Sequence, residues 1–255
     1  MDYGVVMVPA APVRRKPWHQ AEMTNQLLFG EAVEVIKQKG NLWVKIRSLL
    51  DGYEGWLTNT LLEEIKEDNA KSYCEYVSSG FLNVIHLDEM KIRIPMGSSL
   101  PDFMDGQGKI NGSIFQLEGE SIKRNAPAPG VTFIKQLTSQ WLNAPYLWGG
   151  RTILGVDCSG FVQVNYKMIG IDLPRDAWQQ AQEGETIRKL KDAVCGDLAF
   201  FDDKEEIVHV GILLGDDRII HASGKVRIDQ IDKKGIIHSD NGKRTHFLRL
   251  IKRCS

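Results

Sequence analysis

The feature that most constrains the fold is a change of hydrophobic period near residue 125. Before this point, apolar and polar residues alternate in short runs separated by glycines, which is the period of β-strands. After it, Phe133, Leu137 and Trp141 recur at intervals of four, which is typical of an amphipathic helix. Residues 125–130, N-A-P-A-P-G, separate the two regions, and proline and glycine interrupt regular structure. The sequence therefore predicts at least two domains joined by this linker.

The region before the linker predicts small β-barrels. Two alternating strands flank a turn at Lys39-Gly40-Asn41, and Asp51-Gly52 supplies the next turn. The apolar residues of these two strands are Val33 and Val35 on one and Leu42, Val44 and Ile46 on the other. A second run of short strands follows, so we expect one barrel over residues 1–65 and another over 66–125.

The region after the linker predicts an α+β domain over residues 126–255. The first helix is expected to end near residues 143–145, and a second helix spans about Cys158 to Met168, with Gly170 as its cap. Asp176 and Gln179 resemble a capping box for a short helix that ends at Gly184. Four expected strands follow, at residues 197–201, 207–215, 217–223 and 245–252.

Composition and charge exclude several classes of protein. The net charge of −1 gives no overall attraction to nucleic acid or to an anionic membrane surface, and no apolar run approaches the ~20 residues of a transmembrane helix. The four cysteines are widely spaced without a C-x-x-C pair, which favours reduced thiols. At the N-terminus the basic residues follow the apolar patch, the reverse of a secretory signal, so we expect a cytoplasmic protein unless a leader was removed.

The stretch W-G-G-R-T-I-L-G-V-D-C-S-G-F-V, residues 148–162, places Cys158 at the start of a predicted helix. Unpaired N–H groups and the helix dipole favour negative charge there, so the thiol pKa is expected to fall from about 8.5 into a range of roughly 3.5–7.5. This position suits a nucleophile. The alternative is a small buried cysteine, since free cysteine is among the most buried residue types.

Two histidines complete a candidate catalytic group. His209 lies in an apolar strand, and His221 ends the next strand beyond a turn at Gly215-Asp216-Asp217. Antiparallel pairing would bring both histidines onto neighbouring strands, as a base and its orienting group require. Two alternatives remain open: core histidines, and a zinc site formed by Cys158, His209 and His221. The remaining histidines, His19, His86, His238 and His246, receive no assignment.

Four ordered stretches carry a resemblance to a known family. Y-L-W-G-G-R-T-I-L-G-V-D-C-S-G-F-V, G-D-L-A-F-F, V-H-V-G-I-L-L-G and R-I-I-H-A-S-G resemble the NlpC/P60 family of cell-wall cysteine peptidases, over about residues 126–255. The resemblance implies a papain-like fold with Cys158 as nucleophile, His209 as general base and His221 as the residue that orients His209. It implies neither a metal nor another cofactor.

The N-terminal region is similar to bacterial SH3 modules, through L-L-F-G-E and Y-E-G-W-L. The whole arrangement resembles the γ-D-glutamyl-L-diamino acid endopeptidases, which release L-Ala-γ-D-Glu from murein peptides with a free N-terminal L-alanine. The implied substrate-binding residues are Tyr53, Asp176 and Glu22 around the free amine, and Trp148, Asp157 and Ser159 beside the nucleophile. We therefore expect a monomeric enzyme whose partners are such peptides, with no nucleic-acid or membrane partner.

Other functions fit the same motifs. A wall-peptide-binding protein with an inactive peptidase domain would carry similar modules, although Cys158, His209 and His221 are all present. An amidase or acyltransferase could use the same three residues on another amide or ester. The motifs do not distinguish lysine from diaminopimelate as the diamino acid.

Overall fold

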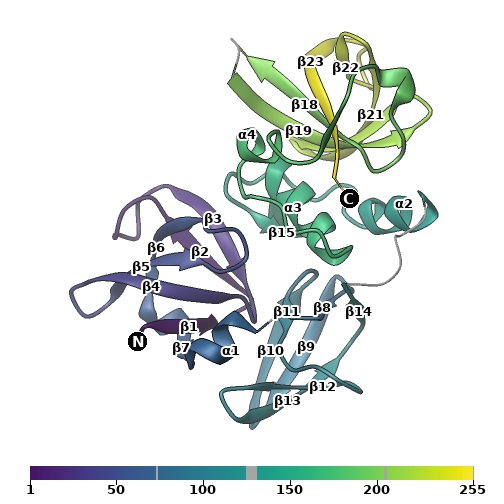
Figure 1. Cartoon of the computed structure of the whole chain (residues 1–255). Helices are drawn as coiled ribbons and strands as arrows, with labels where there is room; N and C mark the ends of the chain where they lie inside the picture. The colour runs from purple at the N-terminus through teal and green to yellow at the C-terminus, as the bar shows by residue number, and fades with distance from the viewer. Residues whose placement is uncertain (73, 125–130, 204–205, 255) are drawn as a thin grey trace. The chain divides into compact units, whose positions relative to one another are not determined.

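The computed structural model describes residues 1–72, 74–124, 131–203 and 206–254, so the linker expected at 125–130 lies outside the described part. The chain divides into two compact units. Met1–Ala126 and Trp148–Ile153 form the first unit, and Pro127–Leu147 and Leu154–Ser255 form the second. Strands predominate in both (Figure 1).

The first unit begins with a seven-stranded, barrel-like antiparallel sheet in the order β3-β2-β6-β5-β4-β1-β7. Its elements are β1 (Tyr3–Val6), β2 (Ala10–Arg14), β3 (Met23–Leu28), β4 (Ala32–Lys39), β5 (Trp43–Ser48), β6 (Glu54–Thr58), the 3-10 helix η1 (Asn59–Leu61) and β7 (Leu62–Glu64). The expected turns are confirmed, since Gly40 and Gly52 have φ of 61° and 73° between these strands. Val33, Val44 and Ile46 are buried and Val35 is half-buried, whereas Leu42 lies in the turn and is 38% exposed.

Residues 66–124 continue the same unit as a short helix and two small sheets, ordered β10-β9-β13-β12 and β11-β8-β14. The elements are α1 (Glu67–Lys71), β8 (Tyr76–Ser78), β9 (Leu82–Leu87), β10 (Met90–Pro95), β11 (Ser99–Leu100), β12 (Gln107–Ile110), β13 (Ser113–Glu118) and β14 (Ser121–Lys123). Ile85 and Phe115 share a core with Val5 and Phe29 of the first sheet. One barrel-like sheet is therefore clear and a second is not, because this segment buries its apolar residues against the first sheet. The domain boundaries remain predictions.

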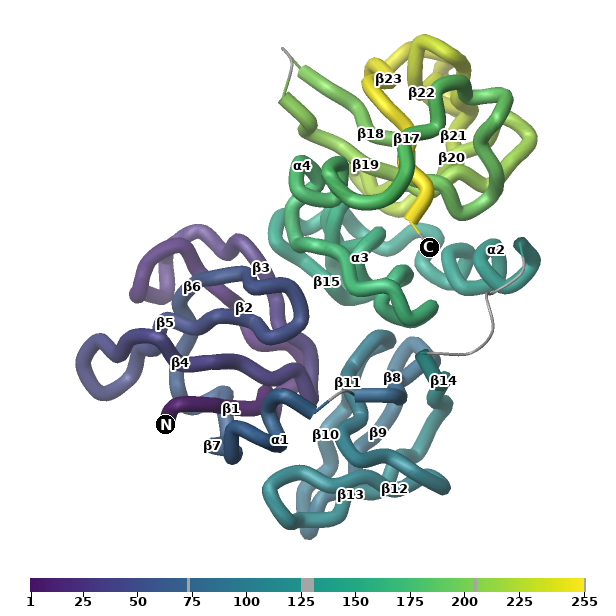
Figure 2. Tube along the Cα trace, in the orientation of Figure 1, coloured from purple at the N-terminus to yellow at the C-terminus, as the bar shows by residue number. Residues whose placement is uncertain are grey.

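The second unit is α+β, as predicted. Its sheet has the order β17-β23-β18-β19-β20-β21-β22, and β22 also pairs with β23, so six strands close into a barrel (Figure 2). The strands are β16 (Gly155–Val156), β17 (Glu185–Ile187), β18 (Leu198–Asp203), β19 (Glu206–Gly215), β20 (Arg218–Ser223), β21 (Lys225–Asp232), β22 (Gly235–Ile237) and β23 (Arg244–Arg253), while β15 (Arg151–Thr152) belongs to the first unit. The helices are α2 (Val131–Ser139), α3 (Cys158–Met168), α4 (Ala177–Gln180) and the 3-10 helix η2 (Leu190–Asp192).

The helix predictions hold best for α3, which spans the expected residues and is followed by Gly170 at φ 88°. Helix α2 ends earlier than expected. Its Thr138 hydroxyl donates back to the Ile134 carbonyl, and Trp141 lies fully buried in the turn that follows. Helix α4 ends at Gln180 and not at Gly184. Helix α3 packs against β19 and β20, which brings the two predicted catalytic segments together.

Candidate active site

Cys158 is the first residue of α3, and the helix begins where the sequence predicts. Asp157 is the N-cap, with extended backbone angles, and its Oδ1 accepts a hydrogen bond of 2.7 Å from the backbone N–H of Gly160. The whole helix is buried, and Cys158 itself is buried. The thiol hydrogen-bonds with the backbone of Val210, the residue after His209 on β19.

The thiol pKa differs from the sequence-based expectation. Burial and, after it, the Asp157 carboxylate raise the pKa of Cys158 to about 12. Hydrogen bonds with the backbone of Val210, the charge of Arg175 and the backbone of Ser159 act in the opposite direction without compensating. The expected lowering at the helix start is therefore wrong. The first turn is dehydrated and carries an anionic cap, so the resting group is a thiol that needs a base.

His209 and His221 lie on adjacent antiparallel strands, as predicted. His209 Nε2 and His221 Nδ1 are 2.8 Å apart, and both side chains are buried. Burial lowers the pKa of both histidines, and for His209 the neighbouring His221 and His246 lower it further, to well below its ordinary value. Both rings are thus neutral at neutral pH, and a neutral His209 can accept a proton.

Two further residues adjoin this pair that the sequence analysis did not single out. His246 on β23 stacks on His209 with ring centroids 4.2 Å apart, and Asp229 Oδ2 on β21 lies 3.1 Å from His221 Nε2. Neither β21 nor the closure of β23 onto β22 was predicted, so their residues had no assigned neighbours. Reading V-R-I-D-Q-I-D as a strand antiparallel to β20 would have brought Asp229 near His221.

Asp157 and Ser159, predicted beside the nucleophile, belong to a buried polar network around Arg175. The Arg175 guanidinium donates to both Asp157 oxygens, at 3.0 and 2.5 Å, and to Ser159 Oγ at 2.8 Å. This ion pair fixes the start of α3. Asp176, the next residue, is half-buried at the start of α4, where its backbone N–H donates to the Gln179 side chain at 3.4 Å.

Tyr146 is another residue that the sequence analysis did not assign. Burial raises the pKa of its phenol, and negative charge on Cys158 and Asp157 raises it further. The phenol therefore stays protonated near the thiol, and a protonated phenol can donate a hydrogen bond to an oxygen that becomes anionic.

Three predicted substrate-binding residues belong to the first unit. Trp148 is exposed, and its indole N–H donates to Glu22 Oε1 at 3.0 Å, while Glu22 Oε2 lies 3.0 Å from Arg15 Nε. Tyr53 is half-buried against the core of the first sheet. The structure thus brings Trp148 and Glu22 together, and a common site with Asp176 stays a prediction.

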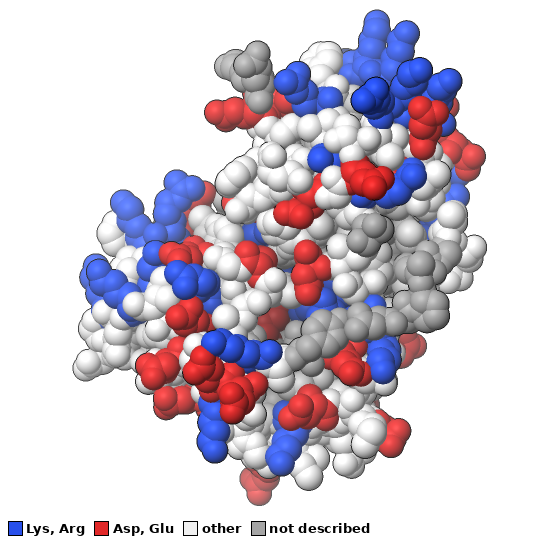
Figure 3. Space-filling model, in the orientation of Figure 1, with Lys and Arg blue, Asp and Glu red and all other residues white. Residues whose placement is uncertain are grey.

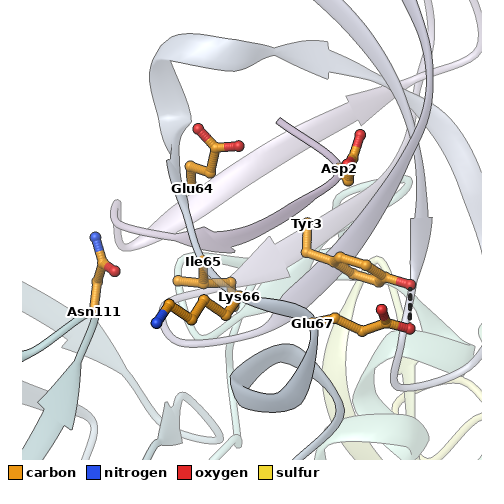
Figure 4. A pocket seen from close by; sticks show the side chains of 7 residues that line it. All are labelled: Asp2, Tyr3, Glu64, Ile65, Lys66, Glu67 and Asn111. Atoms are coloured by element: carbon orange, nitrogen blue, oxygen red, sulfur yellow. Dashed lines mark hydrogen bonds between the residues drawn. The ribbon is translucent and has the colours of Figure 1, made fainter.

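The first unit contains a cavity of about 560 Å³ whose lining includes no cysteine. It is lined by Asp2, Tyr3, Glu64, Ile65, Lys66, Glu67 and Asn111 (Figure 4). The Tyr3 hydroxyl donates to Glu67, and the N-terminal ammonium pairs with Glu64. These carboxylates therefore serve contacts within the unit.

The charge on the face shown in Figure 3 and the potential metal ligands among the described residues add no other candidate. Acidic and basic side chains are interspersed on the face shown in Figure 3, with Lys and Arg gathered where β22 and β23 lie. Across the described segments, no three His, Cys, Asp or Glu side chains are arranged to hold a metal ion. In those same segments, every helix is too short or too polar to cross a membrane.

Comparison with known proteins identifies relatives of both units. Residues 143–244 match the NlpC/P60 family, and residues 13–62 match the bacterial dipeptidyl-peptidase SH3 domain. The gamma-D-glutamyl-L-lysine dipeptidyl-peptidase of Bacillus subtilis is 31% identical over 77% of this chain and 71% of its own. Dipeptidyl-peptidase 6 of Lysinibacillus sphaericus is 26% identical over 91% and 92%. The crystal structure of an NlpC/P60 family protein from Bacillus cereus shares the fold, with a TM-score of 0.80 at 21% identity over 98% of this chain and 99% of that one.

Proposed function

Because the chain belongs to the NlpC/P60 family and is a cysteine peptidase of peptidoglycan-derived peptides, we propose that it cleaves the γ-D-Glu–diamino acid bond of murein peptides with a free N-terminal L-Ala. The product is L-Ala-γ-D-Glu. The observation that carries the proposal is the buried pair of His209 and His221, 2.8 Å apart, on the strands against which the helix of Cys158 packs. The name of the Bacillus subtilis relative, a gamma-D-glutamyl-L-lysine dipeptidyl-peptidase, supports the proposed bond, and the dipeptidyl-peptidase name of the Lysinibacillus sphaericus relative supports release of a dipeptide.

The proposed reaction begins with the neutral thiol. His209 takes the Cys158 proton as the sulfur attacks the γ-carbonyl of D-Glu, and a tetrahedral intermediate forms. The backbone N–H of Cys158, in the first turn of α3, donates to the oxyanion. The C–N bond then breaks, His209 gives its proton to the departing amine, and water hydrolyses the thioester. A thiol pKa raised by burial fits a proton transfer coupled to attack.

Recognition of the free amine is the second part of the proposal. The L-Ala ammonium needs partners, because an unpaired buried charge is costly. Asp176 and Tyr53 would supply a carboxylate and a phenol, and Glu22 a second carboxylate. Glu22 already accepts from Trp148 and pairs with Arg15. We propose Asp176 and Tyr53 as the main partners of the amine, as the family resemblance implies.

The decisive experiment compares L-Ala-γ-D-Glu-L-Lys with its N-acetylated form. Wild-type protein should cleave only the free-amine peptide, and Cys158→Ala should cleave neither. Cys195→Ala, which removes a half-buried thiol elsewhere in the second unit, is the matched control and should retain activity. Cleavage of both peptides would refute the amine requirement, and cleavage of neither would favour a peptide-binding protein. The same assay with meso-diaminopimelate in place of lysine defines the diamino acid.

Variants separate the amine anchor from the catalytic group. Asp176→Ala should raise KM for the free-amine peptide about 10-fold or more, because a charge-assisted hydrogen bond contributes roughly 1.5–3 kcal/mol. Tyr53→Phe should act in the same direction with a smaller effect. An unchanged KM in Asp176→Ala would exclude it as the anchor.

A further inference from the structure

We propose that Asp229 is a positioning residue that decides which ring nitrogen of His209 is free to take a proton. Asp229 lies on β21, is 1% exposed and acts through His221. The inferred proton positions follow from the hydrogen bonds alone, and their catalytic consequence rests on the proposed function.

Asp229 is ionised in the folded protein, because four hydrogen bonds reach its two oxygens. Its Oδ2 accepts from His221 Nε2 at 3.1 Å and from Arg227 Nε at 3.0 Å. Its Oδ1 accepts from Arg227 Nη2 and from the backbone N–H of Ser239, both at 2.9 Å. Burial raises the pKa of Asp229, but these hydrogen bonds outweigh burial and hold the pKa well below its ordinary value. The group is a carboxylate, and a carboxylate only accepts hydrogen bonds.

The Asp229 carboxylate determines which ring nitrogen carries the hydrogen in His221 and, through it, in His209. Because Asp229 only accepts, His221 must carry its hydrogen on Nε2, which leaves the lone pair on Nδ1. That lone pair faces His209 Nε2 at 2.8 Å, so His209 Nε2 carries a hydrogen. In the neutral ring the free lone pair of His209 is then on Nδ1. The same hydrogen bonds remain when His209 takes a proton, since the proton enters at Nδ1.

The surrounding titratable groups do not change these hydrogen positions on His221 and His209. His246 on β23 contacts His209 through its ring face. Arg227 lies beyond Asp229, where it also contacts His238 and Asp240, and Cys158 starts the helix packed on β19. Arginine stays charged at any accessible pH, so it keeps the Asp229 carboxylate ionised.

An Asp229→Asn substitution should reverse the chain of hydrogen bonds. Two donors, Arg227 Nη2 and the backbone N–H of Ser239, meet the Oδ1 position, whereas a single Arg227 donor, Nε, meets the Oδ2 position. The amide oxygen is therefore favoured at the Oδ1 position, which turns the amide NH₂ toward His221. His221 would then accept at Nε2 and carry its hydrogen on Nδ1, and His209 would be forced to carry its hydrogen on Nδ1. The base nitrogen would be occupied. In serine proteases a reversed histidine tautomer of this kind costs roughly 10⁴-fold in kcat.

The first test needs no activity. In the full-length wild-type protein at neutral pH, ¹⁵N spectra of the histidine rings should show His209 and His221 with hydrogens on Nε2. A hydrogen on Nδ1 of His209 would overturn the proposal whether or not the enzyme cleaves the proposed peptide. A failed cleavage assay would refute the substrate and leave the proton positions standing.

Variants test the catalytic consequence on whichever peptide the wild type cleaves. Asp229→Asn should switch both tautomers and lower kcat by at least about 100-fold, with KM changed less than about twofold. Asp232→Asn is the matched control, because Asp232 lies on the same strand as Asp229 and forms a bidentate pair with Arg244 of β23. This variant should keep its activity. In a His221→Gln variant, adding Asp229→Asn should lower kcat little further, because Asp229 acts through His221. If Asp229→Asn only lowers the melting temperature, with tautomers and kcat unchanged, the proposal fails.

Discussion

His246 stacks on His209 with ring centroids 4.2 Å apart and an interplanar angle of 24°. Burial of His209 lowers its pKa first, and His221 and His246 lower it further. A His246→Phe variant keeps an aromatic ring over His209 and removes the titratable neighbour, so the pKa of His209 should rise. An NMR titration of the His209 ring measures this shift. The control is His19→Phe, which changes a histidine packed on Trp43 in the first unit and should leave the pKa of His209 unaltered. An unchanged pKa of His209 in His246→Phe would contradict an electrostatic effect of His246.

The Cys158 thiol should react slowly with alkylating agents near neutral pH. Its pKa of about 12, set by burial and by Asp157, predicts that the alkylation rate rises about tenfold per pH unit from pH 6 to 9 without a plateau. Iodoacetamide labelling followed by mass spectrometry measures the rate at this one cysteine, with Cys158→Ala as the blank. Asp157→Asn removes a negative charge while keeping a good N-cap, so labelling should accelerate. A plateau below pH 8 would show a preformed thiolate instead.

Folding stability should decline on the acid side of neutrality. The pKa values of His209, His221 and His246 all lie below 6.5 in the folded protein, with His246 at about 4. The unfolded chain therefore binds protons first as the pH falls below 6.5, and the free energy of unfolding decreases over the window down to the folded pKa values. We expect a loss of about 1–2 kcal/mol from His246 between pH 7 and pH 5, and further losses in the same direction from His209 and His221. Urea unfolding at several pH values measures it, and His246→Phe should have a shallower pH dependence than wild type.

A buried ion pair in the first unit should contribute strongly to stability. The Arg151 guanidinium donates to both Glu31 oxygens, at 2.8 and 2.9 Å, and both side chains are almost fully buried. Glu31→Ala leaves the arginine charge buried without its carboxylate and should lower the free energy of unfolding by about 3–5 kcal/mol. Glu34→Ala breaks an exposed pair with Arg47 and should cost less than about 1 kcal/mol. Equal losses in chemical denaturation would show that burial of the pair is not the decisive factor.

Much of the second unit could be predicted because its determinants are local. Helix α3 begins at Cys158 since Asp157 is an N-cap before an apolar helical pattern, and it ends before Gly170. The pairing of β19 with β20 follows from two apolar strands joined by Gly215-Asp216-Asp217, whose φ angles are all positive. Those patterns were sufficient to bring His209 and His221 together.

The segment from 66 to 124 was less predictable. Alternation predicts short strands in this segment, yet these form two small sheets that share a core with Val5 and Phe29. Strand alternation shows which face is apolar, but it does not show which other sheet covers that face. The expectation of a second barrel depended on that missing information.

The sequence by itself determined the position of Cys158 at a helix start, the adjacency of two histidines and the family resemblance, because capping, turns and hydrophobic period act over a few residues. The tertiary structure decided the chemistry of these groups. His246 lies on β23, the strand that closes the sheet onto β22, and it stacks on His209. The register of β21 brings Asp229 to His221. Burial then raised the thiol pKa that the helix start alone would have lowered. Desolvation and long-range strand pairing depend on the whole fold, and no local pattern encodes them.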